Sequence, residues 1–387
     1  MRVAYVKSGD VVASLDRLSS IDAVSADDGG PDAFLGDLLR AMPDDRFLLL
    51  GIATIVSSNR AAKFPRTRAV TLAARRRFGA FRNALRVFTE ILGFKPDWII
   101  CGKCGVTLWS SYLASRILRV PLVHSRHNWL VEKTPIGRIA TAIDNWIVRR
   151  TDAVVCHGPY LRDRLAGIGV PHNRTFEFDS GNATLVKQTE SAGYDIPVIN
   201  TGGRQMVLYV GRMVRQKGIF DLLEACARLF PDLPGLCLTY VGTGNDLEAL
   251  REETVRRGLA ERVDFLGRVS HMQLGRVMKQ SQLVATPTQS RFPEGRCMVV
   301  MEALALGIPV VAPGFGPFPY LVRDGVNGLL YRPDSIDELE ETIRNALVDE
   351  ALYRTLANGA KQSGRELLQP KVSYSQALGM ALTQVRV

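Results

Sequence analysis

The sequence predicts an α/β protein built from two doubly wound domains. A chain of 387 residues is longer than one ordinary hydrophobic core supports, so we expect two domains. Short apolar runs alternate with helical segments, and the second half of the chain repeats the alternation of the first. This pattern is typical of parallel sheets that carry helices on both faces. An apolar content of 46% with 23% charged residues is that of a soluble globular protein.

The expected elements follow from these apolar runs. In the first half we expect strands at 3–6, 47–52, 98–101, 122–124 and 153–156, with helices at 107–118 and 136–150. In the second half we expect strands at 206–210, 236–241, 263–266, 283–286 and 309–311, with helices at 220–229, 246–257, 271–279 and 335–347. The polar stretch 178–203 is the expected linker. The predicted domains are therefore 1–185 and 186–365, followed by a helical segment, 366–387, that packs back on the first domain.

The basic charge is concentrated in the first half. Residues 1–182 hold 26 Lys and Arg against 17 Asp and Glu, whereas residues 183–387 hold 23 against 22. The stretch 46–89 contains ten basic residues and no acidic one, including Arg75, Arg76, Arg77, Arg82 and Arg86. On a helix, Phe78, Phe81, Leu85 and Phe88 would form one apolar face beside these arginines.

Three interpretations of this basic segment are open. It is either a core-facing helix with a solvated basic back, or a segment that lies on an anionic membrane surface. Phosphate contacts to nucleic acid are disfavoured, because no nucleic-acid motif accompanies the charge. The N-terminus lacks a signal-peptide core and no run approaches the roughly 20 apolar residues of a spanning helix. We expect a cytoplasmic protein, peripheral on the inner face of the cell membrane if the second interpretation holds.

The cysteines do not indicate a metal or redox centre. Cys101 and Cys104 have the spacing of half a zinc or redox site, but no second pair completes four ligands. They directly follow an apolar run, so a strand end that enters a glycine-containing loop explains them. We expect no bound metal.

Two spaced glutamates are the most informative local feature. Glu302 is the only polar residue in the run 297–306, which would be a buried helix, and Glu294 lies just before it. A carboxylate inside an apolar helix is costly without hydrogen-bond partners, and the hydroxyls of a ribose or a sugar would supply them. The alternative is a capping Glu294 and a Glu302 that is paired with an arginine.

Glycines and cations follow the predicted strands of the second half. Arg212 and Lys217 lie in the loop after the strand 206–210, beside a helix N-terminus, where they would suit a diphosphate. Gly242 follows the next strand, and Gly316 lies in a loop that could present backbone amides to phosphate. Each loop taken alone is also explained as a solvated turn.

The first half has two comparable positions. Gly29 and Gly30 precede a predicted helix and permit a ligand to approach the backbone closely. His124 and His127 lie at the carboxyl end of the strand 122–124, where ligands of doubly wound sheets bind. A lone histidine is more often structural than catalytic, and two of the five histidines at one strand end raise the odds of a functional role.

Together these motifs resemble the retaining glycosyltransferases of family 4. Over 206–330 five motifs occur in the order and spacing of that family: Gly211-Arg212 with Lys217-Gly218, Val241-Gly242-Thr243-Gly244, Phe265-Leu266-Gly267, the pair Glu294 and Glu302, and Asp324-Gly325-Val326-Asn327-Gly328. The resemblance implies the GT-B fold, in which two Rossmann-like domains face an interdomain cleft. The N-terminal domain would take the acceptor and the C-terminal domain the nucleotide sugar.

The resemblance also implies roles for single residues. Arg212 and Lys217 would hold the donor diphosphate and neutralise the leaving group, and Glu302 would bind the ribose hydroxyls. Glu294 would contact the transferred sugar, and His127, which matches the family better than His124, would contact the sugar or its glycosidic region. Six further positions would contact the donor: Gly29, Gly30, Gly242 and Gly316 near the phosphates, and Arg268 and Val269 at the nucleobase. No metal and no cofactor besides the donor substrate is implied.

The predicted function is transfer of a hexose, with retention, from a nucleoside diphosphate to a hydroxyl of a lipid-linked or cell-surface polysaccharide acceptor. A sugar-nucleotide epimerase on the same fold and a nonenzymatic scaffold on an anionic surface are the alternatives. Two departures from the family leave the donor sugar open. Tyr320 replaces an acidic residue, and Gly295-Arg296-Cys297 replaces Gly-Phe-Gly, so that Arg296 would meet a charged sugar or pair with Glu294.

Overall fold

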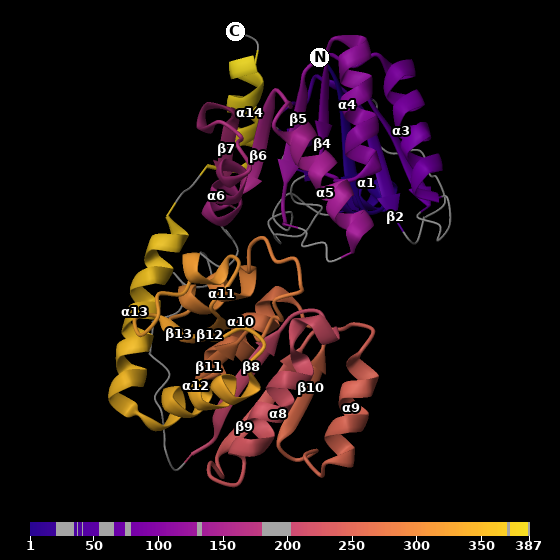
Figure 1. The fold of residues 1–387 in the computed structure, drawn as a ribbon. Helices are drawn as coiled ribbons and strands as arrows, with labels where there is room; N and C mark the ends of the chain where they lie inside the picture. Colours follow the sequence, from indigo (N-terminus) through magenta and orange to yellow (C-terminus); the bar gives the residue numbers. More distant parts are fainter. Residues whose placement is uncertain are drawn as a thin grey trace. The chain divides into compact units, whose positions relative to one another are not determined.

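The computed structural model describes residues 1–20, 35–36, 38–40, 42–53, 66–73, 79–129, 134–179, 203–369 and 372–385. The chain forms two compact units. The first contains Met1–Ser180 together with Lys371–Val387, and the second contains Gly181–Pro370. Both are α/β units with one parallel sheet, as the alternating pattern predicted (Figure 1).

The first unit is built on a seven-stranded sheet of order β3-β2-β1-β4-β5-β6-β7. Every strand pairs in parallel with its neighbours, and the central strand β1 is flanked by β2 and β4. The bounds are β1 Arg2–Ser8, β2 Arg46–Ala53, β3 Thr67–Ala73, β4 Trp98–Cys101, β5 Leu122–Arg126, β6 Ala153–His157 and β7 Thr175–Phe178. The order reverses between β1 and β4, and ligands of doubly wound sheets bind at the carboxyl ends beside such a reversal.

Helices cover both faces of this sheet. The helices are α1 Val11–Ser20, α3 Gly79–Phe94, α4 Val106–Leu118, α5 Pro135–Val148, α6 Pro159–Gly167 and α14 Tyr374–Val385, with a short 3-10 turn at His172–Arg174. One core joins Ala4 and Val6 of β1 to α3, α4, α5 and α6. The other joins Val3 and Tyr5 of the same strand to α1 and α14. Both faces of β1 are therefore buried, which explains its unbroken apolar run.

The second unit repeats the architecture with a six-stranded parallel sheet of order β10-β9-β8-β11-β12-β13. The strands are β8 Gln205–Val210, β9 Leu236–Val241, β10 Val263–Gly267, β11 Leu283–Ala285, β12 Val310–Pro313 and β13 Gly328–Tyr331. The helices are α8 Ile219–Leu229, α9 Leu247–Arg256, α10 His271–Gln280, α11 Met298–Ala305, α12 Ile336–Val348 and α13 Glu350–Leu368. Short 3-10 turns lie at Arg215–Lys217 and Phe318–Tyr320.

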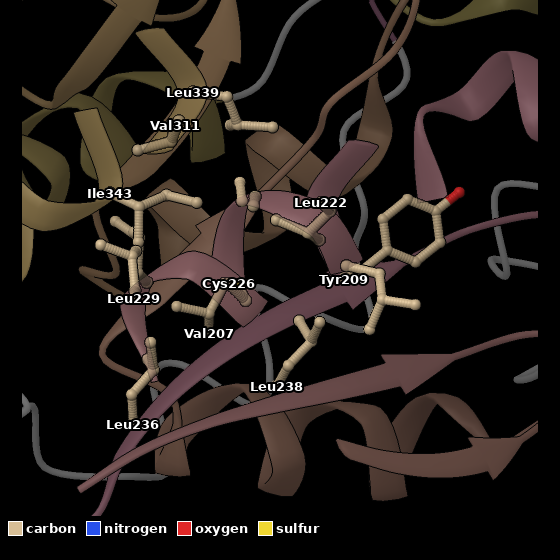
Figure 2. Close-up of a cluster of buried hydrophobic side chains, with 14 of the residues drawn as sticks. Val207, Tyr209, Leu222, Cys226, Leu229, Leu236, Leu238, Val311, Leu339 and Ile343 are labelled. Carbon is tan, nitrogen blue, oxygen red and sulfur yellow. The ribbon is translucent and has the colours of Figure 1, made fainter. Parts of the chain in front are cut away.

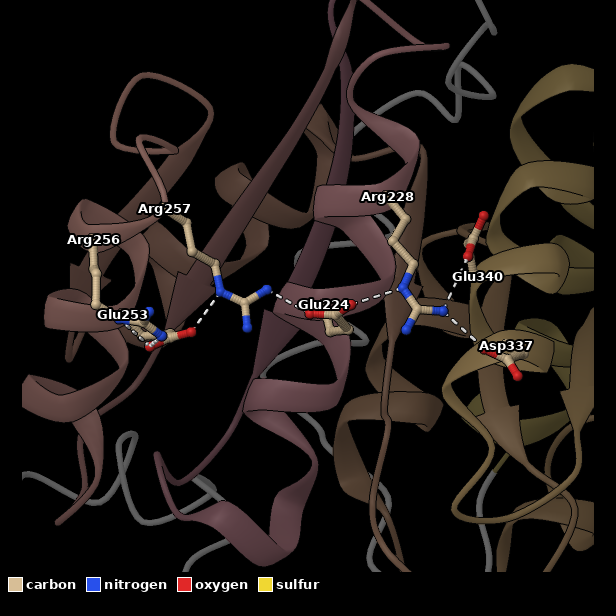
Figure 3. A network of polar contacts seen from close by, with 7 residues as sticks. All are labelled: Glu224, Arg228, Glu253, Arg256, Arg257, Asp337 and Glu340. Atoms are coloured by element: carbon tan, nitrogen blue, oxygen red, sulfur yellow. Dashed lines mark hydrogen bonds and ion pairs between the residues drawn. The ribbon is translucent and has the colours of Figure 1, made fainter.

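Two cores hold this unit together. Figure 2 shows the larger one, in which Val207 and Tyr209 of β8 pack against α8 and α12. The other joins Leu208 to α10 and α11 on the opposite face. A surface chain of ion pairs links α8 to α9 and α12 through Glu224 and Arg228 (Figure 3). These pairs are solvent-exposed and screened, so the cores rather than the ion pairs carry the stability.

Three strands were not predicted, and all three lie at a sheet edge. β3 and β7 flank the first sheet, and β13 flanks the second. Their side chains are mostly half-buried, so that their sequences lack the continuous apolar run that identified the central strands. Three of the four edge strands of the described sheets were thus missed, whereas β10, at the other edge of the second sheet, was predicted.

The apolar face expected over 78–88 is wrong in part. Helix α3 turns Ala84, Val87 and Ile91 toward the sheet, whereas Phe81 and Leu85 are exposed. Phe88 packs at the margin of the core. A core-facing helix with Phe81 and Leu85 inside is therefore excluded. Arg82 and Arg86 are exposed on the same helix, and Arg75, Arg76 and Arg77 lie outside the described residues.

In the part of the chain that the structure describes, none of the helices combines the length and the apolar character needed to cross a membrane.

Candidate active site

The loops that follow β8 and β9 approach each other closely. Gly242, at the end of β9, has φ 133°, and a Cβ there would stand 1.9 Å from the carbonyl oxygen of Gly211. Gly218 has φ 71°, and its Cβ would stand 1.8 Å from the carbonyl oxygen of Pro287. Only glycine fits either position, because a side chain would collide with backbone. These glycines fix the loop that carries Arg212 and Lys217 at the carboxyl edge of the sheet.

Lys217 and Glu294 form an ion pair at this edge, although 77 positions separate them along the chain. Both side chains are largely enclosed, with 15% and 12% of their surfaces exposed. Lys217 ends the 3-10 turn that precedes α8, and Glu294 precedes α11. Such a pair is held in one geometry more firmly than a surface pair, because little water competes for its charges.

The side chains of Arg212 and Lys217 both contact the ring of Phe292. The guanidinium of Arg212 lies 5.2 Å from the centre of the Phe292 ring, and the ammonium of Lys217 lies 4.6 Å from it. Cations are attracted to the face of an aromatic ring by its quadrupole. Phe292 was not among the predicted site residues, since the sequence offers no signal that distinguishes it from a core phenylalanine.

Glu302 lies inside α11, as the apolar run predicted. Only 6% of the surface of Glu302 is exposed, and the helix around it is almost wholly buried. Cys297 lies directly before the first residue of this helix. Burial and then the charge of Glu294 raise the pKa of Cys297 to about 12, with Glu302 adding to the shift and Lys217 opposing it.

The other predicted donor contacts lie on neighbouring loops of the same unit. Arg268 and Val269 follow β10 directly, with Arg268 exposed and Val269 packed at the margin of the core. Gly316 has φ 58° in the loop after β12. Tyr320, in the following 3-10 turn, is 44% exposed. The chain thus places these positions at carboxyl ends of parallel strands, where ligands of this fold class bind.

In the first unit the two histidines have different surroundings. His124 is fully buried within β5, and burial lowers its pKa to about 3, with the charge of Arg126 acting in the same direction. His127 follows the strand and lies 3.0 Å from the Ser125 hydroxyl through Nε2. Burial and then the charge of Lys7 lower the pKa of His127 to about 4. Both rings are neutral at pH 7, and only His127 stands at the carboxyl edge.

In the first unit, the thiols of Cys101 and Cys104 are held in their protonated form. The Cys101 thiol donates to the carbonyl oxygen of Lys103 at 3.4 Å, and burial raises the pKa of Cys101 to about 11. Cys104 is free as well, and burial raises its pKa too. Thiols that are protonated at pH 7 are poor nucleophiles and poor ligands.

Gly29 and Gly30, which were predicted to contact the donor phosphates, lie outside the described residues.

Two protein families match the chain over successive segments. Residues 29–176 match the family "Glycosyltransferase Family 4", and residues 196–363 match "Glycosyl transferases group 1". Each segment falls largely within one of the two structural units.

Three curated relatives are 25%, 27% and 34% identical to the chain over the residues that align. Glycogen synthase of Mycobacterium tuberculosis is 25% identical over 270 residues, which are 69% of this chain and 62% of the synthase. The α-D-kanosaminyltransferase of Streptomyces kanamyceticus is 27% identical over 272 residues, 67% of this chain and 70% of its own. The D-inositol 3-phosphate glycosyltransferase of Mycobacterium marinum is 34% identical over 62% of this chain and 53% of its own. The match thus spans less than two thirds of the synthase.

Solved structures share the fold along the full length. A complex of Anabaena HepE with UDP matches all of both chains at a TM-score of 0.67 and 20% identity. The lipopolysaccharide outer core galactosyltransferase WaaB matches 99% of both chains at a TM-score of 0.63 and 16% identity. At these identities the likeness concerns the fold.

Proposed function

Since the chain belongs to the family 4 glycosyltransferases and has their GT-B fold, we propose that it transfers a hexose from a nucleoside diphosphate to a hydroxyl acceptor, with retention at the anomeric carbon. The observation that carries the proposal is the cluster of Arg212, Lys217 and Glu294 around Phe292 at the carboxyl edge of the second sheet. It provides two cations for a diphosphate and one carboxylate for sugar hydroxyls.

Donor binding would change the partners of Lys217 and Glu294, which are paired with each other in the free protein. A diphosphate that enters beside Arg212 and Lys217 offers Lys217 a stronger anionic partner than the single carboxylate of Glu294. Glu294 is then free to accept hydrogen bonds from the hydroxyls of the sugar. The exchange replaces one charge-assisted contact by several, while Phe292 holds both cations in place.

Glu302 and the surrounding loops would complete the donor site. We assign Glu302 to the ribose hydroxyls, because a buried carboxylate suits two adjacent hydroxyl donors. Arg268 and Val269 would flank the nucleobase, and Gly242 and Gly316 would admit the phosphates. Gly29 and Gly30 are proposed for the phosphates by resemblance. The complex of HepE with UDP makes a uridine nucleotide the first donor class to test.

The chemistry follows from these charges. As the glycosyl bond breaks, negative charge develops on the diphosphate, and Arg212 and Lys217 are already positioned to stabilise it. We propose that the acceptor hydroxyl attacks from the face that the diphosphate leaves. His127 is neutral, so it can exchange hydrogen bonds with a sugar hydroxyl but adds no positive charge to the site.

The acceptor is proposed to be lipid-linked or a cell-surface polysaccharide, taken by the first unit at the inner face of the cell membrane. Residues 1–182, which make up most of that unit, hold nine more basic than acidic residues, and an anionic acceptor such as a lipid diphosphate would match this charge. Arg82 and Arg86 are exposed on α3. Arg75, Arg76 and Arg77 are proposed to contribute to the same basic surface.

A panel of nucleotide sugars, screened for thermal stabilisation and then for turnover, tests the proposal. We expect at least one donor to raise the melting temperature and to be consumed when an acceptor extract is added. Product analysis without acceptor separates transfer from epimerisation. If no nucleotide sugar stabilises the protein or is consumed, the proposed function is wrong.

A further inference from the structure

Helix α5 exposes an apolar stripe along its length. Ile136, Ile139, Ile143 and Trp146 are all exposed, and the first two show 81% and 64% of their surfaces. Steps of three, four and three residues keep the four side chains within an arc of about 80° on an α-helix. The helix packs on the sheet through Ile147, Val148 and the residues beside them. The stripe is therefore additional to the face that the fold requires.

Two neighbouring helices extend this apolar surface. α4 packs beside both α3 and α5, and all three cover the same face of the first sheet (Figure 1). Leu113 and Ile117 are exposed on α4, and Phe81 and Leu85 on α3. Eight of the seventeen exposed large apolar side chains among the described residues thus lie on these three helices. We call this surface the α3–α5 face.

The charges on the α3–α5 face are mostly positive. Exposed arginines flank the stripe on α5 and continue onto the adjacent helices: Arg138, Arg149 and Arg150 at α5, Arg119 at α4, and Arg82 and Arg86 on α3. Arg116 on α4 is exposed as well, but it pairs with Asp152 at 2.8 Å. The guanidinium of Arg150 lies 4.1 Å from the centre of the Trp146 ring. The two acidic residues within these helices are engaged elsewhere. Asp144 is buried and accepts from the Gly105 backbone, and Glu90 pairs with Arg68 at 2.9 Å.

We propose that the α3–α5 face docks on an anionic lipid bilayer, with α5 lying in the plane of the membrane. Isoleucines would enter the boundary between headgroups and acyl chains, and Trp146 would lie at the level of the headgroups. The arginines would meet the lipid phosphates. An apolar stripe that is bordered by cations, and whose described carboxylates are buried or paired, has both components that such a surface requires.

Two other occupants fit these observations less well. In a symmetric pair of copies the arginines of one face would oppose those of the other, and the described carboxylates of Asp152 and Glu90 already pair with Arg116 and Arg68 of the same copy. A nucleic acid would use the arginines, but exposed isoleucines gain nothing from phosphates. An anionic bilayer alone uses both the charge and the apolar stripe.

Docking would also bring the lipid close to the proposed acceptor site, and this step rests on the proposed function. α5 begins nine residues after β5 ends at Arg126, so its first turn lies at the carboxyl edge of the sheet. His127 lies at that edge too. The most exposed residue of the stripe, Ile136, is in this first turn. A lipid-linked acceptor in the docked bilayer would therefore lie near the carboxyl edge of the first sheet, where His127 lies.

Sedimentation with vesicles tests the docking. Vesicles of phosphatidylglycerol and phosphatidylcholine are expected to bind the full chain at low salt, and vesicles of phosphatidylcholine alone to bind it far less.

The double variant Ile136→Ser/Ile139→Ser should weaken binding on the order of tenfold or more. Replacement of Arg138, Arg149 and Arg150 by Gln should weaken it by on the order of fivefold for each arginine and flatten its salt dependence. The matched control is Val255→Ser/Met272→Ser, which removes two equally exposed apolar side chains from the second unit and should bind as the unchanged protein does.

Fluorescence gives an independent measurement. Trp98 and Trp129 are buried, and Trp109 is half-buried and donates to Asp144, whereas Trp146 is exposed. Brominated lipids should therefore quench mainly Trp146, and most of this effect should be lost in Trp146→Phe. Circular dichroism and the melting temperature establish that each variant is folded.

Three outcomes would overturn the docking proposal: no binding to anionic vesicles at low salt, binding that the α5 variants leave unchanged, or self-association that the same variants abolish without vesicle binding. Donor turnover is measured separately on a water-soluble acceptor. Turnover without vesicle binding refutes only the docking, and vesicle binding without turnover on any donor refutes only the transferase.

Discussion

At the scale of single residues, the ion pair between Lys217 and Glu294 is predicted to have two separable roles, in stability and in donor turnover. Lys217→Met or Glu294→Gln leaves one largely enclosed charge without its partner, which should cost about 1–3 kcal/mol of stability. Each should also lower kcat/KM by on the order of a hundredfold or more, through loss of charge stabilisation or of sugar contacts.

The double variant Lys217→Met/Glu294→Gln distinguishes the two roles. It leaves no uncompensated charge, so denaturant unfolding should show stability recovered toward that of the unchanged protein. Turnover should remain lost, because neither group is restored. Recovery of turnover together with stability would show that the pair is only structural.

Phe292 is predicted to position both cations without contacting the chemistry. Phe292→Leu keeps the apolar volume but removes two cation–π contacts, each worth about 0.5–2 kcal/mol depending on exposure. We expect donor affinity to fall by about tenfold, measured as KM for the donor, with a smaller change in kcat. Phe88→Leu, on α3 at the margin of the first unit's core and without a described cation contact, is the control. Equal effects of the two changes would remove the special role of Phe292.

The residue scale also shows what the sequence can reveal about a site. Glu294, Glu302, Arg212 and Lys217 were predicted because charge in an apolar or glycine-rich setting is unusual enough to notice. Their convergence on one donor was predicted from the family resemblance, since the loops that carry them are far apart in the chain and no local pattern connects them. Phe292 was missed because an aromatic residue beside a proline is unremarkable by composition.

His124 makes the stability of the first unit depend on pH. In the unfolded chain its pKa is about 6.5, whereas burial holds it at about 3 in the folded protein. Between these values the unfolded state binds more protons, so stability falls as the pH falls below 6.5. From pH 7.5 to 5.0 this one histidine should remove about 2 kcal/mol.

Urea unfolding at the two pH values measures this dependence, and His124→Asn should reduce it by about that amount. His172, in the short turn before β7, is exposed and provides the control in His172→Asn. A pH dependence that is the same in His124→Asn as in the unchanged protein would contradict the assignment.

At the scale of elements, the loops of Gly242 and Gly218 are predicted to hold the proposed donor-binding edge together. Gly242→Ala places a Cβ against the carbonyl oxygen of Gly211 and also requires φ 133°, so a cost of about 1–3 kcal/mol is expected. The loop of Arg212 should shift, and turnover should fall with stability. Gly93→Ala, on α3, meets no atom within 4 Å and should be neutral or stabilising. Thermal unfolding of both variants measures the difference, and an equally mild effect at Gly242 would show that the loops are not tightly coupled.

Helix α3 shows why helical periodicity alone predicted the wrong buried face. Its sequence contains two apolar arcs, one with Phe81 and Leu85 and another with Ala84, Val87 and Ile91. Both satisfy helical spacing, and only the packing against the sheet selects the second, which has the smaller side chains. The larger residues are left on the surface, where they join the α3–α5 face.

At the scale of the whole molecule, the alternation of strands and helices was enough to predict two parallel sheets. Buried central strands such as β1 and β9 have continuous apolar sequences, so their positions were readable. The edge strands β3, β7 and β13 were not, because half-buried strands need no such run. The order of strands depends on crossovers between distant segments, and no local pattern encodes it.

Binding of nucleoside diphosphates to the purified protein tests the central claim most directly, because it requires no acceptor. Calorimetric titration of UDP, GDP and ADP should show saturable binding of at least one, with UDP the first expectation. Arg212→Met and Lys217→Met should each weaken that binding by about tenfold to a hundredfold, and Glu302→Gln by about tenfold. Lys279→Met, which removes an exposed lysine from the last turn of α10, should leave it unchanged. Absence of binding for all three nucleotides, or affinity that is the same in the site variants as in Lys279→Met, would contradict the account.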